Sequence, residues 1–507
     1  MVTTAELIRR GAARFADRTA VYFQDEVLTY RQVNEAANRF ANILLGLGVQ
    51  KGDRVALLVG NTQWSISLDF ACVKAGIVRV PLNARLSVTE HQRMNDETGA
   101  KWLVHAPELA GVAEQLLEQT PGLQAAGLGC AGAGGGPDLL DSDISADEPQ
   151  VDLSGDDPLL LLYTSGTTGT LKSVVHTQSS YAAVAANILA NLLQPERDSV
   201  MLHAASLIHA SGTFVLPYWL RGGAAAVLPD FNPQTFLQAV GRYRVTETNV
   251  VPTMLGMLLD HSADTDVSSL RRVIYGASPM PRPLITRAIA QWGPIFRQYY
   301  GQTEAPLCIT VLDESDHEDE TLLASCGHPS VDAQVRIVRE DDGTMAAPGE
   351  IGEIQVRAPF QMAGYYNADE LNAEMVADDG WLRTRDMARM DERGYVFLVD
   401  RRGDMIVTGG YNVYPREVED ALMSHPAVAE CAVVGAPDPT WVESVTAFVS
   451  LRTDQEVTAQ ELRDHVRTQL AGYKVPKQVQ FVDVIPKSPV GKILRRALRD
   501  PLWKGEE

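Results

Sequence analysis

Short apolar runs alternate with amphipathic segments in the first part of this sequence, and this alternation constrains the fold more than any other feature. Residues 29–47 carry apolar side chains at three- and four-residue spacing behind a candidate cap at Thr29, which predicts a helix. Residues 54–59 form a continuous apolar run, residues 63–75 repeat the helical pattern, and residues 77–81 form a second apolar run. Strands that alternate with helices in this order predict a parallel sheet, and therefore an α/β fold.

The length of the chain and a change of pattern near residue 400 predict two domains. At 507 residues the chain exceeds what one hydrophobic core usually organises. We expect a large N-terminal domain, residues 1–402, with several subdomains in which helices flank α/β sheets. Residues 403–507 are expected to form a small, mobile α+β domain. The glycine-rich and acidic residues 119–152, and the acidic residues 313–320, are predicted to be surface loops.

Composition excludes several classes of partner. The formal net charge of -21 argues against nucleic acid and against anionic membrane surfaces, because both would repel an acidic protein. The 5 cysteines are scattered, without a CxxC pair or a histidine cluster, so neither a disulfide framework nor a structural metal is expected. The first residues lack the apolar region of a signal peptide, and no apolar run is long enough to span a membrane. We therefore expect a soluble cytoplasmic protein without membrane insertion.

A strand-like run leads into a loop of glycines and hydroxyl residues. Residues 159–163 read LLLLY, and the following TSGTTGTLK contains Thr164, Ser165, Gly166, Thr167, Thr168, Gly169 and Lys172. Glycines let backbone N–H groups approach an anion, hydroxyls donate to phosphate oxygens, and a lysine neutralises charge. The segment is not a Walker A loop, which requires glycine directly before the lysine. The pattern predicts a polyphosphate site, with a flexible surface loop as the alternative.

Further segments make the chain resemble the adenylate-forming superfamily of acyl-CoA synthetases, luciferases and peptide-synthetase adenylation domains. The loop is similar to the family motif YTSGTTG-x-x-K. The other matching segments follow in family order: IYGAS at 274–278, YYGQTE at 299–304, GWLRTRD at 380–386, DRRGD at 400–404, GGYNVYPREVE at 409–419 and PKSPVGK at 486–492. The resemblance covers nearly the whole chain. It implies the acid-CoA ligase branch, with ATP/AMP, Mg2+ and coenzyme A as cofactors and a small-molecule carboxylic acid, or its acyl-AMP, as the partner.

The resemblance also implies roles for individual residues. The adenine side of the nucleotide site would be formed by Gly276, Ala277, Ser278, Tyr299, Tyr300 and Gly301, with Tyr300 stacking on the base. Glu304 would be the ligand of Mg2+ and Thr303 would donate to a phosphate. Asp386 would accept hydrogen bonds from both ribose hydroxyls, and Arg401 would support the ribose and the α-phosphate.

The C-terminal segments imply a change of domain orientation between two reactions. Lys492 would stabilise the charge that builds up on the α-phosphate when a carboxylate attacks it. The segment with Gly409, Gly410 and Tyr411 would border the pantetheine channel after the C-terminal domain has rotated. One site would in this way serve adenylation first and thioester formation second.

Several positions depart from the family pattern. The family loop reads Gly-x-Pro-Lys-Gly, whereas Leu171 and Ser173 flank the lysine here. Arg385 precedes the ribose carboxylate, where the family has glycine. The hinge position is Gly403, which tolerates both signs of φ but supplies no side chain to hold either orientation. These departures keep open a ligase whose adenylation step is weakened.

Three readings follow from the sequence. The first is a complete acid-CoA ligase. The second is a specialised ligase that performs one half-reaction, thioester formation from a preformed acyl-adenylate, or a homologue that only binds its ligand. The third is a stand-alone adenylation enzyme that loads a carrier protein, or a luciferase-like oxygenase.

The acyl pocket is expected beside residues 206–213, which resemble the acyl-gate segment of the family. His209 is a candidate for contact with the carboxylate end of the acid, and a histidine satisfied within the core is the alternative. Small residues predict room for a medium-to-bulky aryl, fatty or polycyclic acid: Ala210, Ser211, Gly212, Gly276, Ala277 and Gly301. The sequence identifies neither the acid nor the oligomeric state, for which a homodimer stays open.

Overall fold

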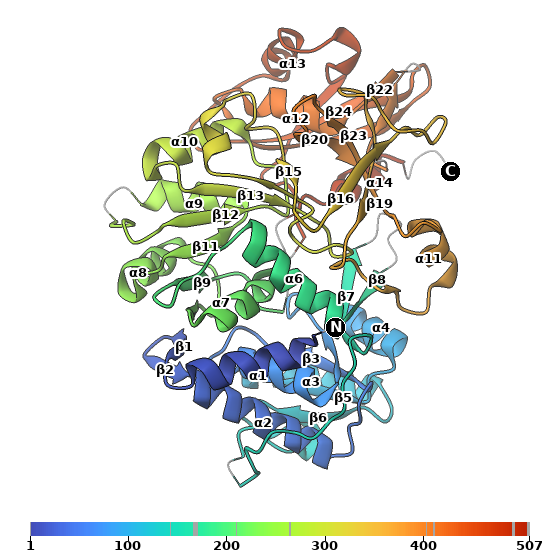
Figure 1. Ribbon diagram of the computed structural model, residues 1–507. Coiled ribbons are helices and arrows are strands. Elements are labelled where there is room, and N and C mark those ends of the chain that lie inside the picture. Colours follow the sequence, from blue (N-terminus) through green and yellow to red (C-terminus); the bar gives the residue numbers. More distant parts are fainter. Residues whose placement is uncertain are drawn as a thin grey trace.

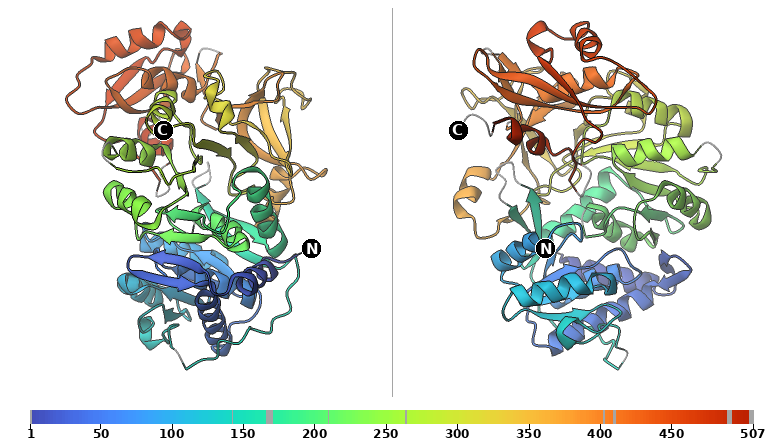
Figure 2. Two further views of the ribbon diagram at one scale, coloured as in Figure 1. Left: turned by 60° about the vertical axis from the view of Figure 1, so that its left-hand side comes forward. Right: turned by 180° about the vertical axis from the view of Figure 1, so that it is seen from behind.

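A computed structural model describes residues 2–141, 143–165, 171–208, 210–262, 265–401, 403–408, 411–488 and 492–503. The N-terminal helices and the C-terminal elements lie at opposite ends of the molecule (Figures 1 and 2). Within the described ranges, no helix has the length and apolar character needed to cross a membrane.

A nine-stranded sheet forms the middle of the molecule (Figure 1). Its strands, in spatial order, are β15 (His328–Pro329), β14 (Thr310–Leu312), β13 (Phe296–Tyr300), β12 (Arg272–Tyr275), β11 (Glu247–Val250), β9 (Val200–His203), β10 (Ala224–Val227), β1 (Thr19–Phe23) and β2 (Glu26–Thr29). The six strands from β13 to β1 run parallel, and the strands at both edges are antiparallel. Parallel strands need cover on both faces, which explains their continuous apolar sequences.

A seven-stranded sheet lies below the first one in Figure 1. Its strands, in spatial order, are β18 (Gly364–Tyr365), β8 (Leu171–Thr177), β7 (Pro158–Ser165), β4 (Val78–Pro81), β3 (Arg54–Leu58), β5 (Trp102–His105) and β6 (Gln124–Gly127). The apolar runs at 54–59 and 77–81 are therefore adjacent parallel strands, as predicted. The expectation of an α/β fold is confirmed.

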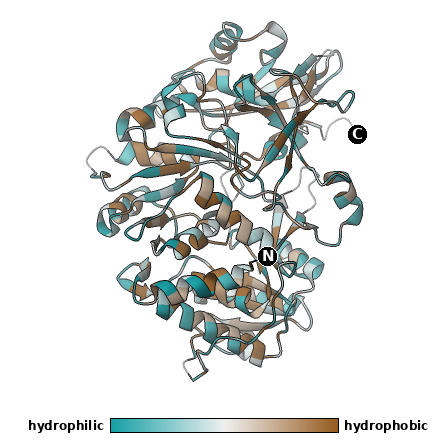
Figure 3. Ribbon diagram, viewed as in Figure 1, coloured by the Kyte–Doolittle hydropathy of each residue, from teal (hydrophilic) through white to brown (hydrophobic). Residues whose placement is uncertain are grey.

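Helices cover both faces of each of the two large sheets. Those of the two large sheets are α1 (Thr4–Phe15), α2 (Tyr30–Gly46), α3 (Ser65–Ala75), α4 (Val88–Thr98), α5 (Ala110–Gln119), α6 (Gln178–Asn191), α7 (Val215–Arg221), α8 (Pro233–Tyr243), α9 (Pro252–His261) and α10 (Arg282–Trp292). The helix predicted behind Thr29 is α2, and the Thr29 side chain and Gln32 cap it reciprocally. Surface helices carry hydrophilic residues outward and hydrophobic residues toward the sheets (Figure 3). This pattern places one continuous core between the two sheets, around α1, α2, α3 and α7.

The prediction of a surface loop at residues 119–152 is wrong in its first part. β6 lies there, paired in parallel with β5 at the edge of the seven-stranded sheet. A side chain on Gly136 would come 1.8 Å from the carbonyl oxygen of Ala125, and one on Gly127 would come 2.0 Å from that of Cys130. The glycines therefore allow the backbone to pack tightly, and composition alone could not separate this role from flexibility.

The acidic residues 313–320 are also more ordered than predicted. Asp313 and Glu314 form ion pairs with Arg297, and Glu314 also pairs with Arg272. The ring of His317 is buried and accepts or donates a hydrogen bond of 2.8 Å with the hydroxyl of Tyr275. These contacts hold the segment against β12 and β13.

Two smaller sheets complete the chain. The first contains β16 (Gln334–Val338), β17 (Gly352–Arg357), β19 (Leu382–Met390) and β20 (Val396–Arg401), with α11 (Asp369–Met375) beside it. The second contains β22 (Tyr411–Val413), β21 (Ile406–Thr408), β24 (Val442–Leu451), β23 (Val428–Asp438) and β25 (Gln478–Phe481), with α12 (Pro415–Met423), α13 (Ala459–Arg467) and α14 (Arg495–Trp503). The second sheet and its helices have hydrophobic cores of their own. The division of the chain at residues 402 and 403 stays a prediction.

Candidate active site

A buried carboxylate gathers polar groups where β13 ends beside β19. The hydroxyl of Tyr300 donates to Asp386 at 2.7 Å, and the amide of Gln302 donates to the same carboxylate oxygen at 2.5 Å. Gln302 also donates to the carbonyl of Thr384 at 2.9 Å. Burial, and then the negative charge of Asp386, raise the pKa of Tyr300 well above its ordinary value, so that its hydroxyl keeps its proton. Asp386 is 7% exposed, and the carboxylate is held in a fixed orientation.

A second carboxylate, that of Glu304, follows shortly after Gln302 along the chain. The hydroxyl of Tyr365 donates to Glu304 Oε1 at 2.7 Å, and the backbone N–H of Met362 donates to the Glu304 carbonyl at 2.7 Å. The backbone of Thr303 is held from β8, because His176 Nε2 lies 2.8 Å from its carbonyl oxygen. That oxygen can only accept, so Nε2 carries the hydrogen. Burial lowers the pKa of His176 to about 4, which keeps the ring neutral at physiological pH.

Two cations lie next to these carboxylates. Lys172 is the second residue of β8, pairs with Thr164 across the β7–β8 ladder, and has its ammonium 5.8 Å from the centroid of the Tyr365 ring. Burial, followed by the nearby charge of Arg385, lowers the pKa of Lys172. The site therefore combines lysine, arginine and glutamate side chains from β8, β19 and the segment after β13, a set that suits a metal-bound polyphosphate.

The turn after β12 supplies a backbone wall. Ala277 has φ +65°, in the left-handed region, and Ser278 follows it at the surface of the turn. A side chain on Gly276 would come 2.5 Å from the carbonyl of Tyr299, and one on Gly301 would come 2.5 Å from the backbone of Leu307. Both glycines are thus needed for close packing. The Tyr299 hydroxyl donates to Asn249 at 3.2 Å from within the core.

The same packing corrects the reason given for a wide acyl pocket. A side chain on Gly212 would come 1.9 Å from the carbonyl of Leu207. Backbone atoms therefore already occupy the space next to this glycine, and it does not widen an acyl pocket. Ser211 is buried, and its hydroxyl lies 2.9 Å from His203 Nδ1. Burial lowers the pKa of His203 to about 4. His203 Nε2 is buried and has no hydrogen-bond partner among the described residues.

Some predicted residues lie wholly or partly outside the described ranges. The residues outside them are Gly166, Thr167, Thr168, Gly169, His209, Gly409 and Gly410. Of Thr164, Ser165, Ala210 and Arg401 only the backbone is described. The backbone of Arg401 pairs with Asp386 between β20 and β19, which puts it next to the buried carboxylate.

The C-terminal candidates lie on the five-stranded sheet and the turn that follows it. The backbone N–H of Lys492 donates to Ser488 Oγ at 3.1 Å, and its carbonyl accepts from the Ser488 N–H at 2.7 Å. These two bonds close the turn on itself, and the ion pair of Lys487 with Glu430 of β23 ties the segment before it to the sheet. Tyr411 is 58% exposed, and its ring stacks on Tyr473 with centroids 4.6 Å apart. Across the predicted boundary, the backbone N–H of Arg416 donates to Asp400 at 2.9 Å.

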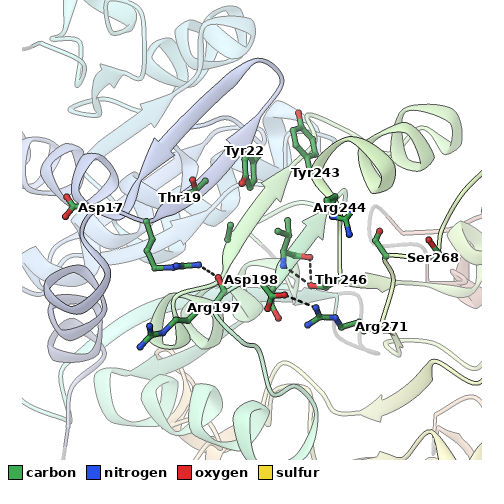
Figure 4. Close-up of a pocket in the computed structure, with 15 residues that line it drawn as sticks. Asp17, Thr19, Tyr22, Arg197, Asp198, Tyr243, Arg244, Thr246, Ser268 and Arg271 are labelled. Atoms are coloured by element: carbon green, nitrogen blue, oxygen red, sulfur yellow. Dashed lines mark hydrogen bonds and ion pairs between the residues drawn. The ribbon is translucent and has the colours of Figure 1, made fainter.

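A cavity of about 700 Å³ lies at the opposite edge of the nine-stranded sheet (Figure 4). It is lined by residues at the amino ends of the parallel strands, such as Thr19, Val200 and Ala224, and by Arg197 and Arg271. Ligands of open parallel sheets bind at the carboxyl ends of the strands, where Tyr300 and Asp386 meet. The cavity is separate from the cluster described above.

Two family models and several relatives match this chain. The model of the AMP-binding enzyme family matches residues 8–366, and the model of the AMP-binding enzyme C-terminal domain matches residues 417–492. This chain belongs to the AMP-binding enzyme family. It is an adenylate-forming enzyme of the acyl-CoA synthetase branch, as the motifs indicated.

Individual members of the AMP-binding family are similar along almost their whole length. A medium/long-chain-fatty-acid–CoA ligase, FadD8 of Mycobacterium tuberculosis, is 37% identical over 97% of this chain and 89% of its own length. A feruloyl-CoA synthase of an Amycolatopsis species is 39% identical over 97% of both chains. The amide bond synthetase McbA of Marinactinospora thermotolerans superimposes with a TM-score of 0.90 at 31% identity, covering 98% of this chain and 99% of McbA.

Family membership indicates which small molecules and which metal ion the enzyme uses. AMP-binding acyl-CoA ligases use ATP, Mg2+ and coenzyme A. The residues present fit Mg2+, because Glu304 offers a positioned carboxylate and this ion prefers one or two carboxylates together with phosphate oxygens. The described residues contain no group of three or more histidine, cysteine, aspartate or glutamate side chains that could hold a metal.

Sequence reasoning missed the residues that hold the site together. His176 orients Thr303, Tyr365 orients Glu304, and Gln302 orients Asp386. Gln302 stands inside the YYGQTE segment, so its place in the motif was a usable signal. His176 and Tyr365 carry no such signal, because each reaches its partner only through tertiary contacts.

Proposed function

We propose that this enzyme is an ATP-dependent acid-CoA ligase that activates a medium-to-bulky carboxylic acid as its acyl-AMP and then forms the acyl-CoA thioester. The observation that carries the proposal is the convergence of three side chains: Asp386 of β19, Glu304 after the carboxyl end of β13, and Lys172 near the start of β8. The similarity to fatty-acid and feruloyl ligases supports a bulky acid as the substrate. The unpaired state of all five cysteines supports a site of action in the reducing cytoplasm.

In the first reaction, a carboxylate oxygen of the acid attacks the α-phosphorus of ATP. An oxygen–phosphorus bond forms, the bond between the α-phosphorus and its bridging oxygen breaks, and pyrophosphate leaves. Asp386 would accept from the ribose hydroxyls while Tyr300 and Gln302 keep its orientation. Glu304 would hold Mg2+, which neutralises charge on the phosphates when it is bound. Lys172 and Lys492 would face the phosphate oxygens, where negative charge develops.

In the second reaction, the thiol sulfur of coenzyme A attacks the acyl carbon. A carbon–sulfur bond forms, the carbon–oxygen bond to AMP breaks, and the thiol proton passes to solvent. The segment that carries Lys492 is tied to the C-terminal sheet by the ion pair of Lys487 with Glu430, so rotation of that sheet about Gly403 would withdraw the lysine and present Tyr411 instead. AMP is a good leaving group, whereas the free carboxylate has none, which is why the first reaction must precede the second.

The test separates the two reactions. A panel of aryl, fatty and polycyclic acids is incubated with ATP, Mg2+ and coenzyme A, and AMP, pyrophosphate and thioester are measured. In parallel, acyl-AMP and coenzyme A are supplied without ATP. We expect thioester in both assays. Thioester formed only in the assay with supplied acyl-AMP would indicate an enzyme that performs only the second reaction. Acyl-AMP formed without thioester would point to a carrier or an amine as the acceptor.

A lysine pair in one turn provides a matched control. Lys492→Ala should slow adenylation by about 100- to 1000-fold, the loss expected when one preorganised charge at a transition state is removed. Thioester formation from supplied acyl-AMP should be retained. Lys487→Ala, in the same turn, removes an ion pair with Glu430 and should leave both reactions within about twofold. Equal loss in the two variants would reject the assignment of Lys492.

A further inference from the structure

Arg385 stands at a strained backbone position next to the buried carboxylate. Its φ is +59°, in the left-handed region that L-residues rarely adopt and that glycine adopts freely. The strand ladder explains the conformation: Arg383 pairs with Gln355 and Met387 with Glu353, so three residues of β19 face one residue of β17. Such bulges re-aim side chains and are common next to active sites. A glycine would fit here without strain, and the sequence has arginine.

The backbone of the bulge is held by side chains around it. The N–H of Arg385 donates to Glu353 Oε1 at 2.9 Å, and the hydroxyl of Thr384 donates to the carbonyl of Ile354 at 2.6 Å. Both partners belong to β17. The structure therefore fixes Arg385 in the left-handed conformation and directs its side chain away from the ladder.

The side chain enters the group of charges around Glu304. The guanidinium of Arg385 pairs with Glu374 of α11 at 2.7 Å, and the arginine side chain is 26% exposed while that of Glu374 is 60% exposed. Figure 1 shows α11 beside β8 and the end of β19. Burial, and then the charge of Arg385, lower the pKa of Lys172. Burial and Glu304 raise the pKa of Tyr365, whose hydroxyl donates to Glu304, and the charge of Arg385 opposes this rise.

This arrangement has two costs in the absence of an anion. The left-handed conformation is unfavourable for a residue with a side chain, and two neighbouring cations repel each other. The partner Glu374 is mostly exposed, and exposed ion pairs contribute little. A strained residue among like charges is explained when a ligand of opposite charge uses it.

We propose that Arg385 binds the β- and γ-phosphates of ATP, and the pyrophosphate formed from them, together with Lys172. A guanidinium presents two parallel N–H groups that match a phosphate. Nucleotide binding would draw Arg385 away from Glu374. The contact strengthens ATP binding beside a loop that lacks the usual proline and glycine. The inference rests on the proposed function, because it concerns the same nucleotide site.

The proposal predicts that Arg385 acts on one half-reaction only. Acyl-AMP has no β- or γ-phosphate, so thioester formation from acyl-AMP should not depend on the guanidinium. Arg385→Gly and Arg385→Ala should each raise the KM for ATP by about 10- to 100-fold, the range of a lost charge-assisted hydrogen bond. Inhibition of adenylation by pyrophosphate should weaken in parallel, while the KM for the acid and the rate from supplied acyl-AMP stay within about twofold.

The pair of variants separates charge from backbone strain. Arg385→Gly relieves the left-handed conformation and should melt at a higher temperature than Arg385→Ala, although both lose the same affinity for ATP. Arg385→Lys keeps a charge but not the planar pair of donors, and its KM for ATP should lie between those of the two variants and that of the wild type. Arg383→Ala, on the same strand with an exposed side chain, is the control and should leave the KM for ATP unchanged.

Two results would overturn the proposal. One is a KM for ATP within threefold of wild type in both Arg385→Gly and Arg385→Ala. The other is an equal loss of thioester formation from acyl-AMP, which would assign Arg385 to the orientation of the C-terminal domain. Failure of the proposed function is distinguishable, because the wild-type enzyme would then form neither acyl-AMP nor thioester in the same assays.

Discussion

The two edges of the nine-stranded sheet both carry charged residues, but they use them differently. At the carboxyl edge, Asp386 is 7% exposed and receives hydrogen bonds from Tyr300 and Gln302. At the amino edge, Arg197 and Arg271 are exposed around a cavity of about 700 Å³ (Figure 4). There Arg271 pairs with exposed Asp198 at 2.8 Å. The candidate site is therefore distinguished by burial and mutual support of its polar groups, whereas the cavity at the other edge is surrounded by exposed charges.

The largest expected effect removes the central carboxylate. Asp386→Ala should lower kcat/KM for ATP by about 1000-fold, because buried Tyr300 and half-buried Gln302 lose their acceptor and the ribose loses its partner, at about 4 kcal/mol. Asp386→Asn keeps an acceptor for Tyr300 and should lose less. Steady-state kinetics with varied ATP measures both. A decrease below tenfold in the alanine variant would remove Asp386 from the nucleotide site.

A smaller effect is expected where only support for a carboxylate is lost. Tyr365→Phe removes the hydroxyl that donates to Glu304 and should reduce adenylation by about tenfold, the value of one hydrogen bond to a charged group. The concentration of Mg2+ for half-maximal rate should rise as well. Unchanged dependence on Mg2+ would show that Tyr365 does not position the metal ligand.

Acid should destabilise the folded enzyme through buried histidines, of which His176 and His203 have the pKa values lowered to about 4. His176 and His203 each have a pKa lowered from 6.5 to about 4 by burial, so the unfolded chain takes up protons below pH 6.5 while the folded enzyme does not. The free energy of unfolding keeps the full contribution of these neutral histidines above pH 6.5, and it decreases as the pH falls from 6.5 toward 4. The loss is about 3 kcal/mol for each histidine at 1.36 kcal/mol per pKa unit.

Urea unfolding at several pH values measures this dependence. His176→Gln should flatten the decrease between pH 6.5 and 4, although it also lowers stability at neutral pH. His261→Gln, at an exposed position, is the matched control and should leave the slope unchanged. An equal slope in the wild type and in His176→Gln would contradict the burial effect.

The smallest effect is expected at the amino edge. Arg271→Ala removes the exposed ion pair with Asp198 and should change stability by less than about 1 kcal/mol and kcat/KM by less than about twofold. The same kinetic assay and thermal melting check both values. A tenfold loss of activity would make the cavity of Figure 4 part of the catalytic cycle and would end the contrast between the two edges.

Local patterns in the sequence predicted elements whose stability arises within a few residues. The capped helix α2 begins directly after Thr29, as the apolar spacing and the cap indicated. Thr458 and Glu461 cap the start of α13 in the same reciprocal way. Where side chains of distant segments decide the structure, the predictions were less good: the expected loop contains β6, and the acidic residues 313–320 are a surface segment held by ion pairs that were not foreseen.

The sequence by itself determined the alternation of strands and helices, the family, and the candidate residues of the nucleotide site, because these follow from short-range periodicity and from contiguous motifs. Only the tertiary structure decided which residues hold them. Tyr365 and Glu304 are 61 positions apart, and Tyr300 and Asp386 are 86 apart. It also decided that Arg385 sits in a left-handed bulge next to Lys172. Contacts of this kind depend on how separate sheets pack together, and no local spacing encodes that packing.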